Sequence, residues 1–270
     1  MGAARNPFHW RGTVAEAEAF VGRERELANV FARLRTLGCV SIVGERRIGK
    51  SSLSYQASAR AGKELGPETR AVYIDMLSAK HHSLQGLLWA ILTGLGGQVG
   101  QVEAESSDAA MAVFEAEIQE LRRQGCLPVV FLDEFEALGS RTEQLGDDLL
   151  ESWRSLGNGG QMAFVATSAR PLDEVTKESG LTSSFYNIFA QMGLKEFAEE
   201  EAKAFIRRAV RVGGFEPSDE AFIARVGGQH PLRLQVAAWH LFEARQRGEL
   251  DFGLLGEQAE AEIAGMMRKK

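Results

Sequence analysis

The sequence predicts an α/β protein with a doubly wound, parallel five-stranded sheet, followed by a small all-helical domain. Two observations support this fold class. Short apolar runs recur along the first 195 residues with helical patterns between them, as in a parallel sheet covered by helices. These runs do not alternate apolar with polar residues, which indicates strands that are buried on both faces.

Five apolar runs are expected to form the strands, the last being the weakest. They are CVSIV (39–43), AVYIDM (71–76), LPVVFLDE (127–134), MAFVATS (162–168) and NIFAQMGL (187–194). Helical patterns cover residues 20–38, 51–65, 84–95, 108–125 and 143–157. In the first, apolar side chains fall on one helical face up to Leu37, and Gly38 is placed to end the helix.

Three further helical patterns follow one another without a strand between them, at residues 198–214, 218–228 and 230–248. The change of pattern predicts the domain organisation. We expect an N-terminal extension at 1–19, an α/β domain at 20–195, a helical lid domain at 196–248 and a tail at 249–270 that forms one more helix.

The composition narrows the classes of function. The chain has 270 residues, is 44% hydrophobic, and carries a formal charge of −6, which argues against a broad nucleic-acid-binding face. No apolar stretch has the length of a membrane helix, and the start of the chain lacks the apolar core of a secretion signal. Cys39 and Cys126 begin apolar runs, which indicates reduced core thiols and a cytoplasmic protein.

The most informative motif is GERRIGKS at residues 44–51, which matches G-x-x-x-x-G-K-[ST] between a predicted strand and a predicted helix. Glycines at 44 and 49 let the backbone curl so that its amides face phosphate oxygens, and the helix start adds positive potential. Lys50 is expected to bind the β- and γ-phosphates and Ser51 to bind Mg²⁺. The predicted nucleotide contacts also include Arg47, Ile48 and Ser52, although Arg46 and Arg47 are expected to point outward.

Acidic residues follow the third predicted strand, in VVFLDEFEAL. Asp133 ends the strand at the sheet edge where the glycine loop also lies, and is expected to hold Mg²⁺ through water. Glu134 is placed to orient or deprotonate the attacking water. The alternative is a strand end followed by a solvated acidic turn, and Glu136 is expected to be only a surface or helix-start acid.

The fourth predicted strand ends in Thr167 and Ser168, and Arg170 follows. A hydroxyl or guanidinium group there can distinguish a triphosphate from a diphosphate, because hydrolysis removes the charge that it meets. We expect this role for Ser168 or Arg170. The alternative is that these residues serve only the turn after the strand.

Two other groups of residues have simpler interpretations. His81 and His82 are expected in a solvated loop rather than in a metal site, because adjacent side chains point in different directions. Trp89, Trp153 and Trp239 fall within apolar helical faces, which predicts core or domain-contact positions.

Three segments together resemble the STAND class of P-loop ATPases, relatives of AAA+ and ORC/Cdc6-like proteins. They are FVGRERELANVFARL before the glycine loop, FLDE as the Walker B strand and GGQHPLRLQ in the helical region. The resemblance implies that Val21, Gly22 and Arg23 lie around adenine, and that His230 and Pro231 meet the base and phosphates from the lid. Without the resemblance, Gly22 and Arg23 are a turn before a helix and Pro231 a first-turn helix proline.

The function expected from these motifs is an ATP-dependent molecular switch, slow in hydrolysis, that uses ATP and Mg²⁺. Its nucleotide state would control the lid and assembly with a protein partner or a nucleotide-dependent homo-oligomer. STAND proteins usually continue into winged-helix and sensor domains, and only about 20 residues follow the lid here. Sensing and effector functions are therefore expected on partner chains, unless the chain is a fragment.

Two rival functions remain open from the sequence. One is an AAA+-type oligomeric ATPase that loads onto or remodels DNA, for which Arg207 or Arg208 could serve a neighbouring subunit. The other is a non-hydrolysing scaffold in which ATP only stiffens the lid.

Overall fold

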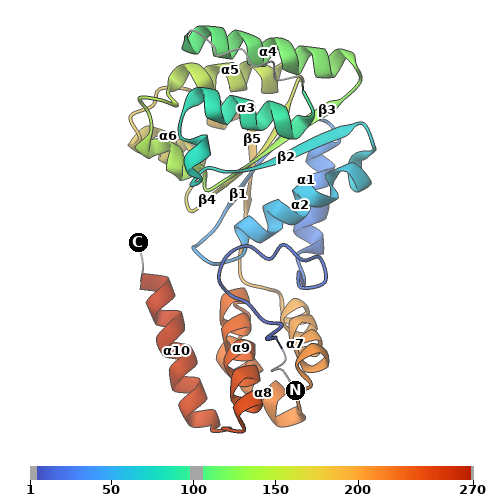
Figure 1. Ribbon diagram of the computed structural model, residues 1–270, viewed down its shortest axis with the longest axis vertical. Helices are drawn as coiled ribbons and strands as arrows, with labels where there is room; N and C mark the ends of the chain where they lie inside the picture. The colour runs from blue at the N-terminus through green and yellow to red at the C-terminus, as the bar shows by residue number, and fades with distance from the viewer. Residues whose placement is uncertain (1–4, 98–105, 269–270) are drawn as a thin grey trace. The chain divides into compact units, whose positions relative to one another are not determined.

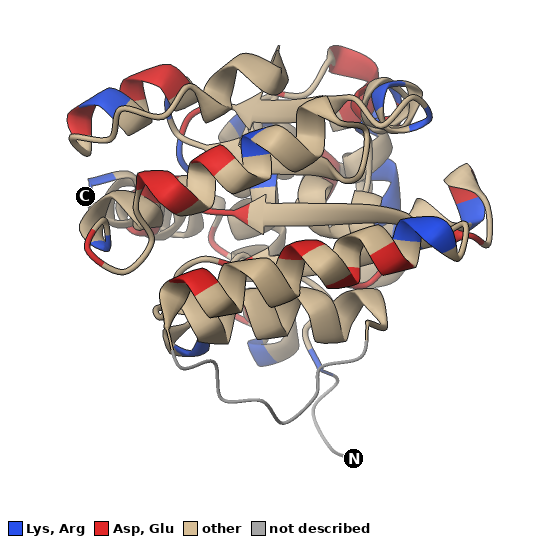
Figure 2. Ribbon diagram, turned by 90° about the horizontal axis from the view of Figure 1, so that it is seen from above, with Lys and Arg blue, Asp and Glu red and all other residues tan. Residues whose placement is uncertain are grey.

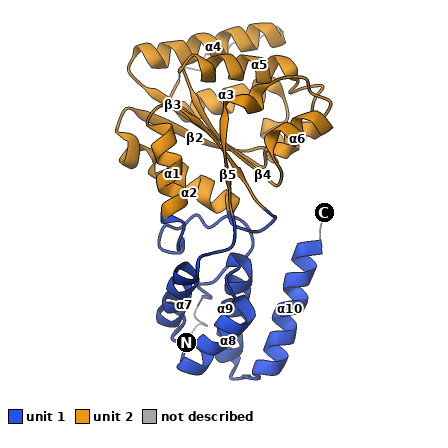
Figure 3. Ribbon diagram, turned by 180° about the vertical axis from the view of Figure 1, so that it is seen from behind, with its two compact units in different colours: residues 1–24, 45–49, 195–270 blue, residues 25–44, 50–194 orange. Residues whose placement is uncertain are grey.

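The computed structural model describes residues 5–97 and 106–268 and divides into two compact units (Figure 3). We call residues 25–44 and 50–194 the α/β unit. We call the remaining described residues, from 5–24, 45–49 and 195–268, the helical unit. The glycine loop thus contributes its central residues to the helical unit and its two ends to the α/β unit.

The α/β unit contains one sheet of five parallel strands, in the order β2-β3-β4-β1-β5 (Figure 1). The strands are β1 (Cys39–Val43), β2 (Thr69–Asp75), β3 (Leu127–Asp133), β4 (Ala163–Ser168) and β5 (Phe189–Gly193). Every residue of the central strand β4 is buried. The predicted fold class is confirmed, whereas the expected burial on both faces does not extend to the edge strands β2 and β5, which are only partly buried.

Helices lie on both faces of this sheet (Figure 1). One face carries α1 (Glu24–Leu34) and α2 (Lys50–Leu65), and the other carries α3 (Leu84–Leu95), α4 (Ser107–Arg123) and α5 (Asp147–Asn158). A further short helix, α6 (Leu172–Glu178), precedes β5. The first helix was expected to continue to Leu37, but α1 ends at Leu34. Leu37 instead lies in the turn after the helix, with a φ of 54°.

Aromatic side chains form much of the core of the α/β unit. Trp153 of α5 is fully buried and lies 5.4 Å from the ring of Phe164, which in turn makes an edge contact with Phe185 at 5.3 Å. The expected core position of Trp153 is therefore confirmed. Cys39 is also buried and free, and burial raises the pKa of its thiol to about 11.

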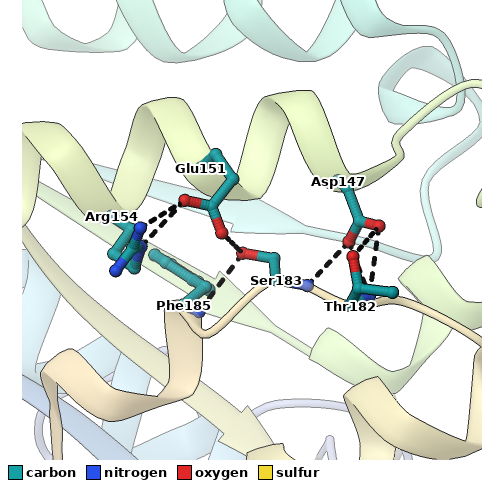
Figure 4. A network of polar contacts seen from close by, with 6 residues as sticks. All are labelled: Asp147, Glu151, Arg154, Thr182, Ser183 and Phe185. Atoms are coloured by element: carbon teal, nitrogen blue, oxygen red, sulfur yellow. Dashed lines mark hydrogen bonds and ion pairs between the residues drawn. The ribbon is translucent and has the colours of Figure 1, made fainter.

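Two carboxylates of α5 hold the segment between α6 and β5 (Figure 4). Asp147 accepts hydrogen bonds from the backbone amides of Thr182 and Ser183 and from the Thr182 hydroxyl. Glu151 accepts one from the Ser183 hydroxyl at 2.7 Å and also pairs with Arg154. These bonds satisfy polar groups of a segment that has no strand or α-helix to pair with.

The helical unit contains α7 (Glu199–Gly213), α8 (Pro217–Gly227), α9 (Pro231–Arg247) and α10 (Phe252–Arg268). The N-terminal segment packs into the same unit: Phe8 is 1% exposed and stacks on Phe215 at 5.7 Å. Asn6 donates to the Trp239 carbonyl and to Glu243. The sequence alone had indicated no role for this segment.

The surface carries both signs of charge. In Figure 2, both acidic and basic residues lie along the helices. Within the described ranges 5–97 and 106–268, no helix combines the length and apolar character that crossing a membrane requires.

Candidate functional site

The glycine loop follows β1 and leads directly into α2. The Gly44 amide donates to the Ser168 carbonyl at 3.3 Å, which joins the start of the loop to the end of β4. Lys50 is the first residue of α2 and is only 7% exposed. Its ammonium group donates to the Gly44 carbonyl at 2.8 Å, so the two ends of the loop meet through the side chain that the motif assigns to phosphate.

The loop backbone contains two left-handed residues. Arg47 has a φ of 68° and Gly49 a φ of 98°. A Cβ built at Gly49 would meet nothing within 4 Å, so this glycine is required by its conformation rather than by crowding. Arg46 is exposed as expected, whereas Arg47 is half-buried and its Nε is buried, so only Arg46 follows the prediction of outward-pointing side chains.

Backbone strain concentrates at predicted site residues. Among the described non-glycine residues, those with positive φ are Arg23, Leu37, Arg47 and Glu134. All except Leu37 belong to the predicted site. Left-handed backbone is costly for residues with a Cβ and tends to persist where a site needs it.

The Walker B acid Asp133 is 4% exposed at the end of β3. Its Oδ1 accepts a hydrogen bond from the Thr167 hydroxyl at 2.5 Å, and its Oδ2 accepts one from the Tyr73 hydroxyl at 2.7 Å. Both donors come from the neighbouring strands β4 and β2. The carboxylate is therefore held from both sides of its own strand.

Glu134 follows with a left-handed φ of 56° and precedes a 3₁₀ helix, Phe135–Ser140. Its amide donates to the Thr167 hydroxyl at 3.0 Å. Thr167 therefore joins Asp133 and Glu134 by one hydroxyl group. The sequence places Thr167 at this edge of the sheet but assigns the role of distinguishing triphosphate from diphosphate to Ser168 or Arg170.

Ser168 and Arg170 make other contacts. The Ser168 hydroxyl is fully buried and donates to the Arg170 carbonyl at 2.6 Å. The Arg170 guanidinium is about half exposed and pairs with Glu178, which raises the pKa of Arg170. The structure thus does not bring these two side chains to Asp133, and their predicted role remains a prediction. Glu136 accepts from the Ala169 amide.

The oxygen donors of this edge fit a divalent cation such as Mg²⁺. Ser51 and Ser52 occupy the first turn of α2 directly after Lys50, and Asp133 supplies a buried carboxylate. Mg²⁺ prefers oxygen ligands and is commonly bound through one or two carboxylates together with substrate phosphates. The described residues contain no cluster of three or more His, Cys, Asp or Glu that could hold a metal ion.

In the helical unit, Arg23 is buried and contacts the centre of the glycine loop. Its guanidinium donates to the Ile48 carbonyl at 3.1 Å and to the Lys195 carbonyl at 2.7 Å, and lies 4.7 Å from the Phe197 ring centroid. Its amide donates to Glu201 at 2.5 Å. Arg23 thus fixes the backbone of the loop.

Gly22 and Val21 precede Arg23. Gly22 has a φ of 73°, and a Cβ there would approach the Glu201 carboxylate to 3.0 Å. Glycine is therefore favoured at position 22 both by conformation and by the close side chain. Val21 is half-buried against the apolar core of the helical unit.

His230 lies at the start of α9 in the same unit and is 3% exposed. Its Nδ1 accepts from the Leu232 amide at 3.2 Å, so it caps the helix, and Pro231 is the first residue of α9. Its Nε2 lies 3.5 Å from the Glu45 carboxylate of the glycine loop. Burial lowers the pKa of His230, with Glu45 acting in the opposite direction.

Of the two adjacent histidines outside this region, His81 differs from expectation. His81 is not in a solvated loop: it is 3% exposed, and its Nδ1 bonds the Asp75 carbonyl at 2.7 Å. His82 bonds the Leu77 carbonyl through Nε2. The expectation was wrong because a 3₁₀ turn at Ala79–His81 returns the first ring to the end of β2.

Sequence reasoning missed Tyr73 and Glu201. Tyr73 lies in an apolar run where an aromatic residue is ordinary, and no motif marks it. Glu201 lies 178 residues from Arg23, so only the tertiary structure brings the two together.

Comparison with known proteins adds a family and a set of related folds. The AAA domain family matches residues 33–176, which is more than half of the chain and contains the glycine loop, Asp133 and Thr167. No curated protein matches the chain.

Solved structures share the fold at low sequence identity. The Walker-type ATPase PABY2304 of Pyrococcus abyssi aligns with a TM-score of 0.67 and 15% identity, over 95% of this chain and 76% of that one. Aeropyrum pernix ORC2, solved with ADPNP and ADP, aligns with a TM-score of 0.61 and 16% identity, over 96% of this chain and 71% of that one. Aeropyrum pernix ORC1 in complex with DNA aligns with a TM-score of 0.58 and 17% identity, over 90% of this chain and 66% of that one.

These likenesses show that the fold is shared. The strand–loop–helix context that the G-x-x-x-x-G-K-[ST] motif requires is present. By its fold the chain is a P-loop NTPase, and by its match over residues 33–176 it belongs to the AAA domain family.

Proposed function

We propose that this protein binds ATP with Mg²⁺ and hydrolyses it slowly, and that its nucleotide state controls the helical unit and assembly with a partner, as in a STAND-type switch. One observation carries the proposal. The Thr167 hydroxyl donates to Asp133 and accepts from the Glu134 amide. The next residue of the same strand, Ser168, accepts a hydrogen bond from the Gly44 amide of the glycine loop through its carbonyl.

Each residue has a defined task in this proposal. Lys50 exchanges its contact with the Gly44 carbonyl for the β- and γ-phosphates, whose charge makes a stronger partner. Ser51 and Asp133 would hold Mg²⁺, which neutralises charge on the phosphoryl group. Glu134 orients the attacking water or accepts its proton. Thr167 keeps Glu134 and Asp133 in fixed relation.

The coupling to the helical unit rests on the contacts of the loop centre. The Ile48 carbonyl accepts from Arg23, and Glu45 lies beside His230. A loop that changes its backbone when phosphate binds changes these contacts as well. Differential contacts in two nucleotide states are what a switch requires.

The first test compares wild type with Lys50→Ala. Lys50→Ala removes a charged hydrogen bond to phosphate, which contributes about 1.5–3 kcal/mol to binding. ATP should therefore bind roughly 10- to 100-fold more weakly to the variant. Lys63→Ala, an exposed lysine near the end of the same helix, is the control and should bind normally. Equal ATP binding by wild type and Lys50→Ala would refute the site.

The second test uses Glu134→Gln. Removal of a general base lowers turnover by about 10²–10⁴-fold, while ATP binding should remain. Glu143→Gln, at an exposed position, is the control. Bound nucleotide that remains ATP in wild type after long incubation would favour a non-hydrolysing scaffold instead.

A second candidate is an AAA+-type oligomeric ATPase that acts on DNA. It is favoured by the fold shared with an ORC1 protein solved in complex with DNA, and the net charge of −6 argues against it. ATPase activity stimulated by DNA at about 50 mM salt and lost by about 200 mM would support this candidate. A particle mass that increases with ATP but is indifferent to DNA would support the switch.

A further inference from the structure

The Walker B acid has a partner that no motif predicts. Tyr73 of β2 pairs in parallel register with Phe131, two residues before Asp133 on the neighbouring strand β3. Alternate residues of a strand point to the same face, so the Tyr73 and Asp133 side chains leave the sheet together. The Tyr73 hydroxyl reaches Oδ2 of Asp133 at 2.7 Å.

The Asp133 carboxylate is therefore held by two neutral hydroxyl groups, one on each oxygen. Thr167 occupies Oδ1 from β4, and Tyr73 occupies Oδ2 from β2. Because the side chain is 4% exposed, water contributes little to its orientation. The plane of the carboxylate is set by these two donors.

The Tyr73 ring is itself fixed by α2, the helix that begins with Lys50 and Ser51. Tyr55 of this helix makes an edge contact with the Tyr73 ring, with centroids 5.4 Å apart and planes at 77°. Edge-to-face packing of this kind is a favourable aromatic geometry. The Tyr73 hydroxyl thus has little freedom to leave Asp133.

We propose that Tyr73 is a positioning residue for the divalent cation of this site. It orients the Asp133 carboxylate so that the lone pairs left by Tyr73 and Thr167 face the metal and its water. Groups that orient metal ligands without touching the metal are commonly worth 10- to 100-fold in metal affinity or activity. The inference rests on the proposed ATPase function and adds a residue to it.

The experiment compares full-length wild type, Tyr73→Phe and Tyr55→Phe. The first substitution removes only the hydroxyl on Asp133, and the second removes the same atom from the neighbouring ring and serves as the matched control. ATP affinity is measured by calorimetry with Mg²⁺ and with EDTA, and the half-saturating Mg²⁺ concentration is measured at fixed ATP. Thermal unfolding without ligand is followed in parallel.

For Tyr73→Phe we expect a half-saturating Mg²⁺ concentration raised about tenfold, with ATP affinity in EDTA unchanged. Tyr55→Phe should keep the wild-type Mg²⁺ dependence. A lower melting temperature of Tyr73→Phe with unchanged Mg²⁺ dependence would show a purely structural role and overturn the inference, while the ATPase proposal would stand. If wild type binds no nucleotide with Mg²⁺, the proposed function fails and the inference fails with it.

Discussion

Buried charged side chains have different surroundings in the two units. In the α/β unit, Lys50 donates to the Gly44 carbonyl, and Asp133 accepts from the hydroxyl groups of Tyr73 and Thr167. In the helical unit, Asp219 is fully buried in α8 and pairs with Arg245 of α9, with 2.6 Å between Oδ2 and Nε.

The comparison suggests how each unit uses its charge. A buried ion pair fixes two helices relative to each other but leaves no charge for a ligand. Lys50 donates to the Gly44 carbonyl, a neutral partner that a phosphate oxygen can replace. The Asp219–Arg245 pair of the helical unit thus joins two helices, whereas Lys50 and Asp133 of the α/β unit lie at the candidate nucleotide site.

The largest expected effect is the loss of stability when a large core side chain is removed from each unit. Trp153→Ala removes a fully buried indole from the aromatic core of the α/β unit, which should lower the free energy of unfolding by about 4 kcal/mol. Trp239→Ala, at a half-buried position in the helical unit, should lower it less. Urea unfolding of both variants measures the difference, and equal losses would contradict it.

The second prediction concerns the ion pair of the helical unit. Arg245→Met leaves the Asp219 carboxylate buried without its cation and should cost about 3 kcal/mol of folding stability. Arg247→Met is the matched control, because Arg247 is exposed on the same helix and pairs with exposed Glu249, which is worth little. Chemical denaturation should separate the two variants clearly. If both lose the same stability, the ion pair is not what holds α8 to α9.

The third prediction concerns the contacts of α5 in the α/β unit (Figure 4). Partial burial acts to raise the pKa of Asp147, but the hydrogen bonds from Thr182 and Ser183 outweigh it, so its pKa is lowered. A carboxylate with a lowered pKa adds stability that is present above its ordinary pKa of about 4 and is lost as the pH falls through the folded value.

Asp147→Asn should therefore cost about 1 kcal/mol at pH 7 and progressively less as the pH falls below about 4. Asp148→Asn is the control, since Asp148 shares the first turn of α5 and is exposed. Melting temperatures across pH 3–7 provide the measurement. A difference between wild type and Asp147→Asn that persists undiminished at pH 3 would contradict the assignment.

The smallest expected effect concerns His230 in the helical unit. Burial lowers the pKa of this side chain, so the unfolded chain takes up its proton first as the pH falls below about 6.5. Stability should therefore decline between pH 6.5 and the folded pKa of His230. In His230→Asn, the new side chain can still cap α9, and the decline should be smaller.

Thermal unfolding at pH 7.5 and 5.5 compares the two proteins. The melting temperature of His230→Asn at pH 7.5, where the histidine of wild type is neutral, shows any loss of stability that comes from packing alone. An equal pH dependence in wild type and His230→Asn would show that His230 does not contribute to it.

The sequence by itself determined the sheet, its five strands and the glycine loop with Lys50, Asp133 and Glu134 near one edge. These features follow from local pattern, because a two-sided buried strand is apolar throughout and a phosphate loop needs glycine at fixed spacing. The helix at 84–95 was predicted with the bounds observed for α3. The strand ends were predicted to within two residues.

Only the tertiary structure decided which side chains complete the site. Tyr73 and Thr167 reach Asp133 because β2 and β4 flank β3, although they lie 60 and 34 residues away in the sequence. Arg23 contacts Ile48 and Glu201, 25 and 178 residues away in the sequence, because these segments pack together in the helical unit. Hydrogen bonds between distant segments depend on strand order and helix packing, which local residue patterns do not encode.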